Sequence, residues 1–304
     1  FNGITDQVTV DGSLYELPFR SDYWLIYYNK DVFDAAGIAY PSNDMTMEDY
    51  DALARQLTDT TYGSQVYGCH YHTWRSAVEL FGILDGKHSI LDGNYDWMIP
   101  YYDMILSEED DGVCQTYTDL STEGLHYSAA FSNGNVAMMN MGSWFISTLI
   151  SNLDSGEYDS SLCGNWGIAS YPHPDGAEAG STIATITGLA VTSASENKDA
   201  AFDFVNWVSG TEGAKVMAST GNFPAIMTDD VINTIAGMAG FPTDEGSKEA
   251  LNITNAYLEV PYAENVSEIN SILDTYHTSI MNREVTVEEG VASMNEQVGK
   301  ILNQ

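Results

Sequence analysis

The sequence has few basic residues and no long apolar run, and both absences restrict what the protein can do. Lysine and arginine number 10 against 44 aspartates and glutamates, for a formal net charge of −34. Neutralising nucleic-acid phosphates takes clustered basic side chains, so this balance argues against a nucleic-acid partner. No run of about 18 or more apolar residues occurs, and the sequence therefore predicts no membrane-spanning helix.

Cysteine is also scarce. The three cysteines, Cys69, Cys114 and Cys163, form no CxxC pair and are too few for a disulfide scaffold. One bridge with one free thiol and three buried thiols both fit the count. Cys69 stands close to His70 and His72 on an alternating segment, but no second cluster has the spacing of a zinc site.

Signals of catalysis are equally weak. Residues 92–103 imitate part of a calcium-binding loop, but Trp97 occupies the position that requires glycine. No nucleophile elbow, phosphate-binding loop or dinucleotide fingerprint appears. A carboxylate pair for glycoside hydrolysis remains an open alternative, although no particular pair stands out among 44 acidic residues. We therefore expect no metal ion, no cofactor and no enzymatic activity.

Strand and helix patterns alternate along the 304 residues, 44% of which are hydrophobic. YWLIYY, residues 23–28, is aromatic and predicts a buried strand. Asn29 then caps a helix over residues 30–36, and Gly37 ends it. Because this alternation continues to the C-terminus, the sequence predicts an α/β fold with enough apolar residues for a large core.

Local signals place further elements. Thr46 and Thr286 each open a capping box, and so each begins a helix. Residues 11–19 read as a short strand that Pro18 ends. Residues 122–132 read as one helix before a strand that ends in Gly-Ser-Trp.

Aromatic residues make up 12% of the chain, and several fall at predicted strand ends or in loops. Most rings of this kind belong to a core, because they supply large buried area. Sugars, however, lay their C–H faces on aromatic rings and need charged or amide partners for their hydroxyls. The segments FRSDYW and HYHTWR interleave aromatic and polar residues in the way that such a site requires.

Six segments in order resemble the extracellular solute-binding proteins of carbohydrate ABC importers, the family that includes maltose-binding protein. The resemblance covers essentially the whole chain. The matching segments are GSLYELPFRSDYWLIYYNKDVFDAAGI, MTMEDYDALARQL, AFSNGNVAMMNMGSW, NWGIASYPHP, TITGLAVTSASENKDAAFDFVNWVSGTEGAKVMASTGNFPA and REVTVEEGVASMNEQVGKIL.

The resemblance implies the two-lobe, type II periplasmic-binding-protein-like fold, with the N-terminal lobe incomplete in this chain. Family members carry a leader and further βαβ units before the first matching strand, whereas this sequence opens on Phe1 without an initiator methionine. The expected N-terminal lobe comprises residues 1–21 and 188–259. The expected C-terminal lobe comprises residues 22–187 and 260–304.

The family pattern also assigns ligand-binding positions. The aromatic residue of the Gly-Ser-Trp turn stacks on a sugar ring, a role that falls to Trp144. Asp22 matches an acidic acceptor for sugar hydroxyls. Arg20 and Tyr23 flank Asp22, and His72 and Trp74 are expected at the cleft on topology alone. Thr187 and Gly188 belong to the second crossover between the lobes, and Phe223 to the GNFPA loop.

The function implied is capture of a mono- or oligosaccharide outside the cytoplasm, as a periplasmic protein or a cell-surface lipoprotein. The partner would be the membrane permease of an ABC importer, and the protein itself a monomer. Three alternatives stay open: the same fold binding a non-sugar solute such as iron or a polyamine, a glycoside-active enzyme, and a structural or adhesive role.

Overall fold

The structure is a computed structural model that describes residue 5, residues 8–58 and residues 65–303. Its strands are β1 (Leu17–Asn29), β2 (Tyr67–His70), β3 (Val136–Gly142), β4 (Trp166–Ser170), β5 (Thr182–Leu189) and β6 (Ala256–Leu258). Its helices are α2 (Lys30–Ala36), α3 (Met47–Leu57), α4 (Ser76–Ile83), η1 (Asp96–Met98), α5 (Ile99–Asp110), α6 (Tyr117–Glu123), α7 (Tyr127–Ser132), α8 (Trp144–Ser155), α9 (Ser160–Cys163), α10 (Lys198–Val208), α11 (Thr211–Ala218), α12 (Asp229–Ala236), α13 (Glu245–Glu249), α14 (Val266–Met281) and α15 (Val287–Leu302).

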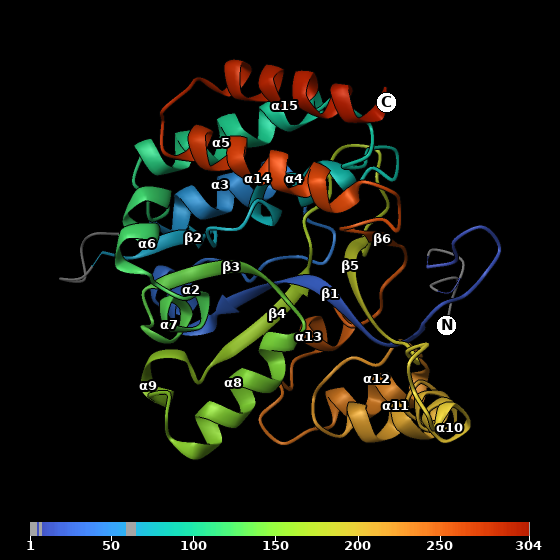
Figure 1. Ribbon diagram of the computed structural model, residues 1–304. Helices are drawn as coiled ribbons and strands as arrows, with labels where there is room; N and C mark the ends of the chain where they lie inside the picture. Colours follow the sequence, from blue (N-terminus) through green and yellow to red (C-terminus); the bar gives the residue numbers. More distant parts are fainter. Residues whose placement is uncertain (1–4, 6–7, 59–64, 304) are drawn as a thin grey trace.

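One long strand, β1, organises the molecule (Figure 1). Its first half pairs antiparallel with β5, as far as Tyr23 opposite Ala184. Its second half, from Trp24 onward, pairs antiparallel with β3 and β4. β2 joins β3 and β6 joins β5, both in parallel, so the order is β2-β3-β1-β5-β6. Cover on both faces of the sheet explains why residues 23–28 are all buried and apolar or aromatic instead of alternating.

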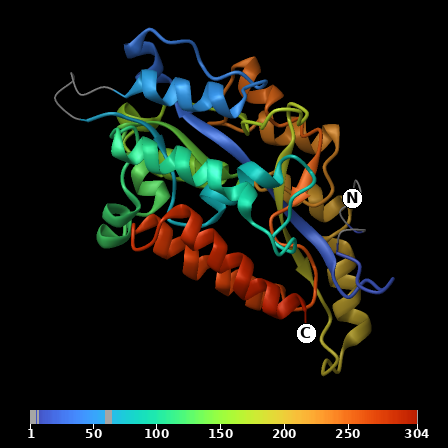
Figure 2. The same cartoon turned by 90° about the horizontal axis from the view of Figure 1, so that it is seen from above.

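Helices cover both faces of the sheet around the second half of β1. The helices α3, α4, α5, α14 and α15 lie on one side and α8 on the other (Figure 1). Seen from above, β1 crosses the molecule diagonally, and it begins at the end where α10 lies (Figure 2). Among the described residues, every helix is too short or too polar to cross a membrane.

The predicted caps are confirmed. The Asn29 side chain accepts a hydrogen bond from the amide of Asp31, and Gly37 ends α2 with φ 67°. Thr46 forms the predicted capping box with Asp49 at the start of α3. Thr286 forms the second one at α15.

Two local predictions were wrong. Pro18 does not end a strand: β1 begins at Leu17 and passes through Pro18 opposite Gly188, with a register shift before Arg20. A proline is tolerated there because its missing N–H falls at the start of a strand and next to an irregularity. Residues 122–132 are not one helix, because Gly124, with φ 61°, ends α6 before α7 begins.

The two predicted lobes stay a prediction. α10, α11 and α12 gather at one end of the molecule, beside the first half of β1 (Figure 1). α13 belongs to the same sequence range but packs against β4. Asp244, its N-cap, forms an ion pair of 2.5 Å with Lys30, so residues 188–259 contact both ends of β1.

Candidate functional site

The turn after β3 is tied to the middle of β1 through Ser143. The Ser143 amide donates to the carbonyl of Tyr23 at 2.8 Å, and the Tyr23 amide donates to Ser143 Oγ at 3.2 Å. Ser143 Oγ in turn donates to Asp22 Oδ1 at 2.9 Å. These hydrogen bonds hold the start of α8 against the middle of β1, where its pairing with β5 ends and its pairing with β3 and β4 begins.

Asp22 is buried and already engaged. Its carboxylate accepts from Ser143 and forms an ion pair with Arg20, with 2.6 Å between Arg20 Nε and Asp22 Oδ2. Burial raises the pKa of Asp22, and the charge and hydrogen bonds of Arg20 and the hydroxyl of Ser143 oppose that rise. In this geometry Asp22 positions Arg20, whose side chain is partly exposed.

Trp144 is the first residue of α8 and is half-buried. A Cβ added to Gly142 would lie 2.0 Å from Trp144 Cζ3, so the indole ring occupies the space beside that glycine. The indole N–H donates to the hydroxyl of Tyr127 at 3.1 Å. The Gly-Ser-Trp sequence thus lets the ring fold back over its own turn.

Trp144 belongs to a tryptophan cluster, which we define as Trp24, Trp74 and Trp144. Trp24 is buried and meets the other two rings nearly edge-on, with centroids at 5.5 Å from Trp144 and 6.5 Å from Trp74. Trp74 and Trp144 lie 6.3 Å apart. Trp74 is 40% exposed, so the cluster offers an indole surface to solvent.

His72 lies against this cluster, 4.6 Å from the Trp74 ring and 5.3 Å from Tyr127. Burial and the nearby His126 lower the pKa of His72 to about 4. The imidazole is therefore neutral at neutral pH and contributes ring surface without a charge.

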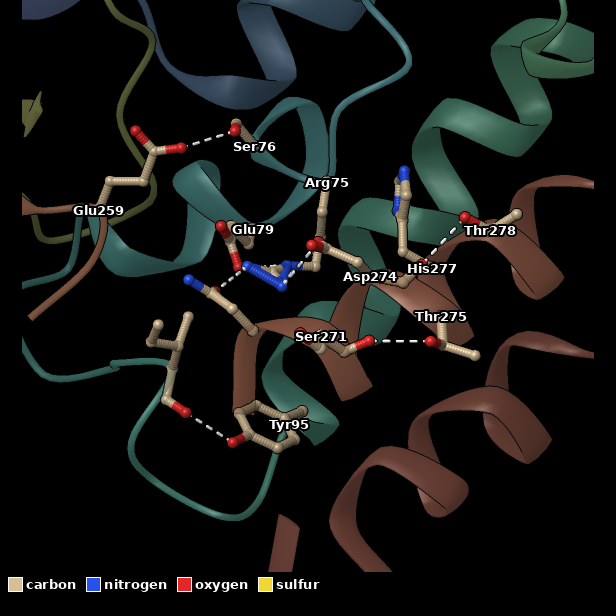
Figure 3. Close-up of polar contacts among 12 residues, drawn as sticks. Arg75, Ser76, Glu79, Tyr95, Glu259, Ser271, Asp274, Thr275, His277 and Thr278 are labelled. Atoms are coloured by element: carbon tan, nitrogen blue, oxygen red, sulfur yellow. Dashed lines mark hydrogen bonds and ion pairs between the residues drawn. The ribbon is translucent and has the colours of Figure 1, made fainter. Parts of the chain in front are cut away.

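A polar pocket of about 300 Å³ opens beside Trp74. Its lining residues are Thr73, Trp74, Arg75, Ser76, Glu259, Val260, Asn270, Asp274, His277 and Thr278. They come from the segment after β2, the start of α4, the segment after β6, and α14, so the pocket lies where distant parts of the chain meet (Figure 3).

Arg75 is the charged centre of the polar pocket. Its Nε donates to Glu79 Oε2 at 2.9 Å, its Nη2 donates to Asn270 Oδ1 at 2.6 Å, and its Nη1 lies 3.2 Å from Asp274 Oδ1. Burial raises the pKa of Glu79 to about 7 against the lowering effect of Arg75. Three groups therefore hold one planar guanidinium in place, which suits it to orient a polar ligand.

Glu259 joins the pocket to the long strands. Its Oε1 accepts from Ser76 Oγ and its Oε2 from Thr185 Oγ1, each at 2.6 Å. Its amide donates to the carbonyl of Ala184 on β5. A second, larger hollow of about 560 Å³ shares Val260 with the polar pocket, and most of its lining side chains are apolar.

The remaining expected site residues lie elsewhere. Thr187 is exposed on β5, opposite Arg20. Gly188 gives room to the Glu16 carboxyl, which a Cβ there would meet at 2.3 Å. Tyr23 is buried and lines a separate hollow, and its ring lies edge-on to Phe223 at 6.0 Å. Phe223 is 0% exposed, so its ring serves the core in this structure.

The structure thus brings together Trp74, His72 and Trp144, with Asp22 and Arg20 behind the same turn. The sequence did not predict Glu259 or Asn270 as site residues. Arg75 was part of the segment HYHTWR but was not itself predicted to bind ligand. Glu259 is the last residue of the expected N-terminal lobe, directly before the range 260–304 that returns to the other lobe. Asn270 has no local signal, because only its contact with Arg75 across the fold distinguishes it.

The chain is similar to known proteins over most of its length. The model for bacterial extracellular solute-binding proteins matches residues 1–215. A mannitol-binding protein of Pseudomonas aeruginosa is 24% identical over 223 residues, which make up 71% of this chain and 49% of that protein. The chain therefore spans about half the length of this curated relative.

Solved structures agree. A sugar transporter from Rhizobium etli, in an open conformation, is 48% identical, with 98% of this chain and 75% of that chain covered and a TM-score of 0.91. An ABC substrate-binding protein from Listeria monocytogenes in complex with cycloalternan is 22% identical, with 98% and 74% covered and a TM-score of 0.80. These likenesses confirm the expected α/β, type II periplasmic-binding-protein-like fold. Since the family model matches more than half of its residues, this chain belongs to the bacterial extracellular solute-binding proteins.

Proposed function

We propose that this chain is the substrate-binding component of an ABC importer and that it captures a mono- or oligosaccharide outside the cytoplasm. One observation carries the proposal: the exposed indole of Trp74 stands beside a polar pocket in which Arg75 is fixed by Glu79, Asn270 and Asp274. A flat apolar surface suits the C–H face of a sugar ring, and a fixed donor with several acceptors beside it suits the hydroxyl groups.

Each group has a distinct task in this proposal. The C–H face of a sugar ring lies on Trp74, and Trp144 extends the surface for a further ring. Arg75 donates to ring hydroxyls, and the carboxylates of Glu259 and Asp274 accept from them. Charged partners make such hydrogen bonds stronger than neutral ones. The polyol and sugar ligands named for the Pseudomonas and Listeria proteins support a polyhydroxyl ligand.

The site lies between the two proposed lobes, residues 1–21 with 188–259 and residues 22–187 with 260–304. The paired strands β1 and β5 connect these ranges, and Glu259 is bonded to both β5 and α4. A ligand that contacts both lobes would close them about these strands. The closed form would then deliver the unaltered ligand, as a monomer, to the permease, with no nucleic-acid partner.

Isothermal titration of the chain with a panel of monosaccharides, oligosaccharides and mannitol tests the proposal. The matched variants are Trp74→Ala, Trp144→Ala and, as a control, Trp207→Ala, whose indole is exposed on α10 away from the cluster. We expect saturable heat from at least one sugar, weakened by Trp74→Ala and unchanged by the control.

Two results would contradict the proposal. If Trp207→Ala and Trp74→Ala weaken sugar affinity equally, the tryptophan cluster does not form the binding site. If no polyhydroxyl ligand gives heat, a non-sugar solute is favoured. Continuing heat with release of a shortened sugar would instead indicate a glycoside-active enzyme.

A further inference from the structure

A second cluster of reactive side chains lies outside the polar pocket, around Cys69 on β2. The Sγ atoms of Cys69 and Cys114 and a carboxylate oxygen of Glu108 all lie within 4.8 Å of one another. Cys69 is on β2, Glu108 is in the last turns of α5, and Cys114 is in the loop that follows α5. All three side chains are buried, with exposures of 0% for Cys69, 0% for Glu108 and 3% for Cys114.

The backbone builds this cluster. The Val113 amide donates to the Glu108 carbonyl at 2.8 Å, which folds the loop back on the end of α5. The Cys69 amide donates to the Val113 carbonyl at 3.4 Å, which attaches the same loop to β2. The three side chains therefore meet because of ordered main-chain contacts and not through a chance approach of mobile groups.

Buried polar atoms gather here without partners. Within the described residues, neither carboxylate oxygen of Glu108 has a partner with hydrogen-bond geometry. Its polar neighbours include the side chains of Tyr71 and Asp51. Unsatisfied buried carboxylates are costly, and native structures satisfy them with protein, water or an ion.

We propose that Cys69, Cys114 and Glu108 bind a zinc ion that fastens β2 to the end of α5. Two thiolates and a carboxylate are ligands that Zn²⁺ accepts, with bonds of about 2.3 Å to sulfur and about 2.0–2.2 Å to oxygen. Tetrahedral bonds of these lengths separate the ligand atoms by roughly 3.4–3.8 Å, which the 4.8 Å limit accommodates. A water molecule completes the tetrahedron, and the protons of the two thiols and of the Glu108 carboxyl pass to solvent.

A disulfide between Cys69 and Cys114 is the main rival. Its formation releases two electrons and two protons and needs an oxidant such as oxidised glutathione. It would consume both sulfur ligands and leave the Glu108 carboxylate as unsatisfied as before. The zinc ion satisfies all three groups together, so the unpartnered carboxylate favours the metal.

Neither the spacing of Cys69 with His70 and His72 nor any local motif indicates this site. The fold supplies different partners to Cys69, from 39 and 45 residues further along the chain. The consequence is structural, because β2 leads directly into the segment that carries Trp74 and Arg75.

Titration of the reduced, metal-free chain with Co²⁺, followed by displacement with Zn²⁺, tests the site. Cobalt bound to thiolates gives charge-transfer absorption that carboxylate or imidazole sites lack. The variants are Cys69→Ser, Cys114→Ser and Glu108→Gln. Cys163→Ser is the matched control, because that thiol is buried on α9 outside the cluster.

We expect one Co²⁺ per chain with thiolate absorption in the wild type and in Cys163→Ser, and its loss in both other cysteine variants. Glu108→Gln should weaken Zn²⁺ binding at least ten-fold, and Zn²⁺ should raise the melting temperature of the wild type. No thiolate absorption in the folded, reduced wild type would overturn the proposal, whether or not the serine variants fold. The protein should also be denatured without reduction and its thiols counted. A single free thiol, together with a disulfide-linked peptide that contains Cys69 and Cys114, would overturn the proposal and support the disulfide.

Discussion

The indole ring of Trp144 lies where a side chain on Gly142 would begin. A Cβ on Gly142 would meet three atoms of that ring at 2.0–2.3 Å. The same ring packs on Trp24 and donates to Tyr127, so its place is fixed from three directions. The turn after β3 therefore depends on a glycine for the position of an aromatic ring and not for an unusual backbone angle.

Gly142→Ala should move the Trp144 ring. Because the ring cannot retreat without losing Trp24 and Tyr127, we expect a loss of about 1–3 kcal/mol in the free energy of unfolding, as for other overpacked sites. Urea denaturation followed by tryptophan fluorescence measures it. Gly299→Ala is the control with the opposite sign. That glycine is inside α15 with open space around it, and alanine should stabilise the helix by up to about 1 kcal/mol.

The buried ion pair of Arg75 and Glu79 gives a second prediction. Both side chains are almost fully buried, at 5% and 1% exposure. Arg75→Leu leaves a buried carboxylate without its main partner and should lower the free energy of unfolding by about 3–5 kcal/mol. Adding Glu79→Leu should recover most of that loss, because an apolar pair needs no desolvated charge.

Chemical denaturation of the single and double variants at pH 7 checks this prediction. Lys300→Ala, which breaks an exposed pair with Glu296, serves as the control and should have a far smaller effect. If the double variant is less stable than Arg75→Leu alone, Glu79 stabilises the fold through contacts other than its pair with Arg75.

Buried histidines predict a dependence on pH. Burial and the Arg75 charge lower the pKa of His277 to about 3, whereas an unfolded histidine titrates near 6.5. Between these values the unfolded chain binds a proton that the folded chain refuses, so stability falls as the pH is lowered. The loss is about 1.4 kcal/mol per pH unit, or about 2 kcal/mol from pH 6.5 to pH 5, for this one residue.

His277→Asn isolates that contribution, because asparagine retains a polar group near the Tyr102 hydroxyl to which His277 Nδ1 is bonded. The free energy of unfolding, measured in urea at pH 6.5 and pH 5, should fall less in this variant than in the wild type. Ser271→Ala, at an exposed hydroxyl on α14 that does not titrate, should keep the wild-type slope. Identical slopes in His277→Asn and the wild type would contradict the assignment.

The range of the interactions explains what the sequence could predict. The caps at Asn29, Thr46 and Thr286 involve atoms at most three residues apart, so the local sequence is enough to predict them. Trp144 and Trp74 could be nominated because a family pattern or a mixed segment marks them. Glu259 and Asn270 could not, since their partners Ser76 and Arg75 are 183 and 195 residues away.

The error at Pro18 has the same origin. Pro18 looked like the end of a strand because a proline lacks an N–H, but β5 fixes the path of β1 through that point. There a tertiary partner outweighs a local preference. Phe223, expected at the cleft from its GNFPA loop, stays a prediction as a ligand-binding residue, and in this structure its ring packs on Tyr23 while its carbonyl accepts from the Ser21 amide.

Glu259 supplies the last prediction, because it accepts hydrogen bonds from Ser76 on α4 and Thr185 on β5 at once. If this carboxylate holds the two elements in register for ligand binding, Glu259→Gln and Thr185→Val should each weaken sugar affinity, and their effects should not add. A coupling free energy of about 0.5–3 kcal/mol is expected for groups in direct contact. Titration calorimetry of the two single variants and the double variant measures it, with Ser271→Ala as a control at an exposed hydroxyl on α14. Additive losses would mean that Glu259 contacts the ligand independently of β5, and unchanged affinity in all variants would place the ligand away from the polar pocket altogether.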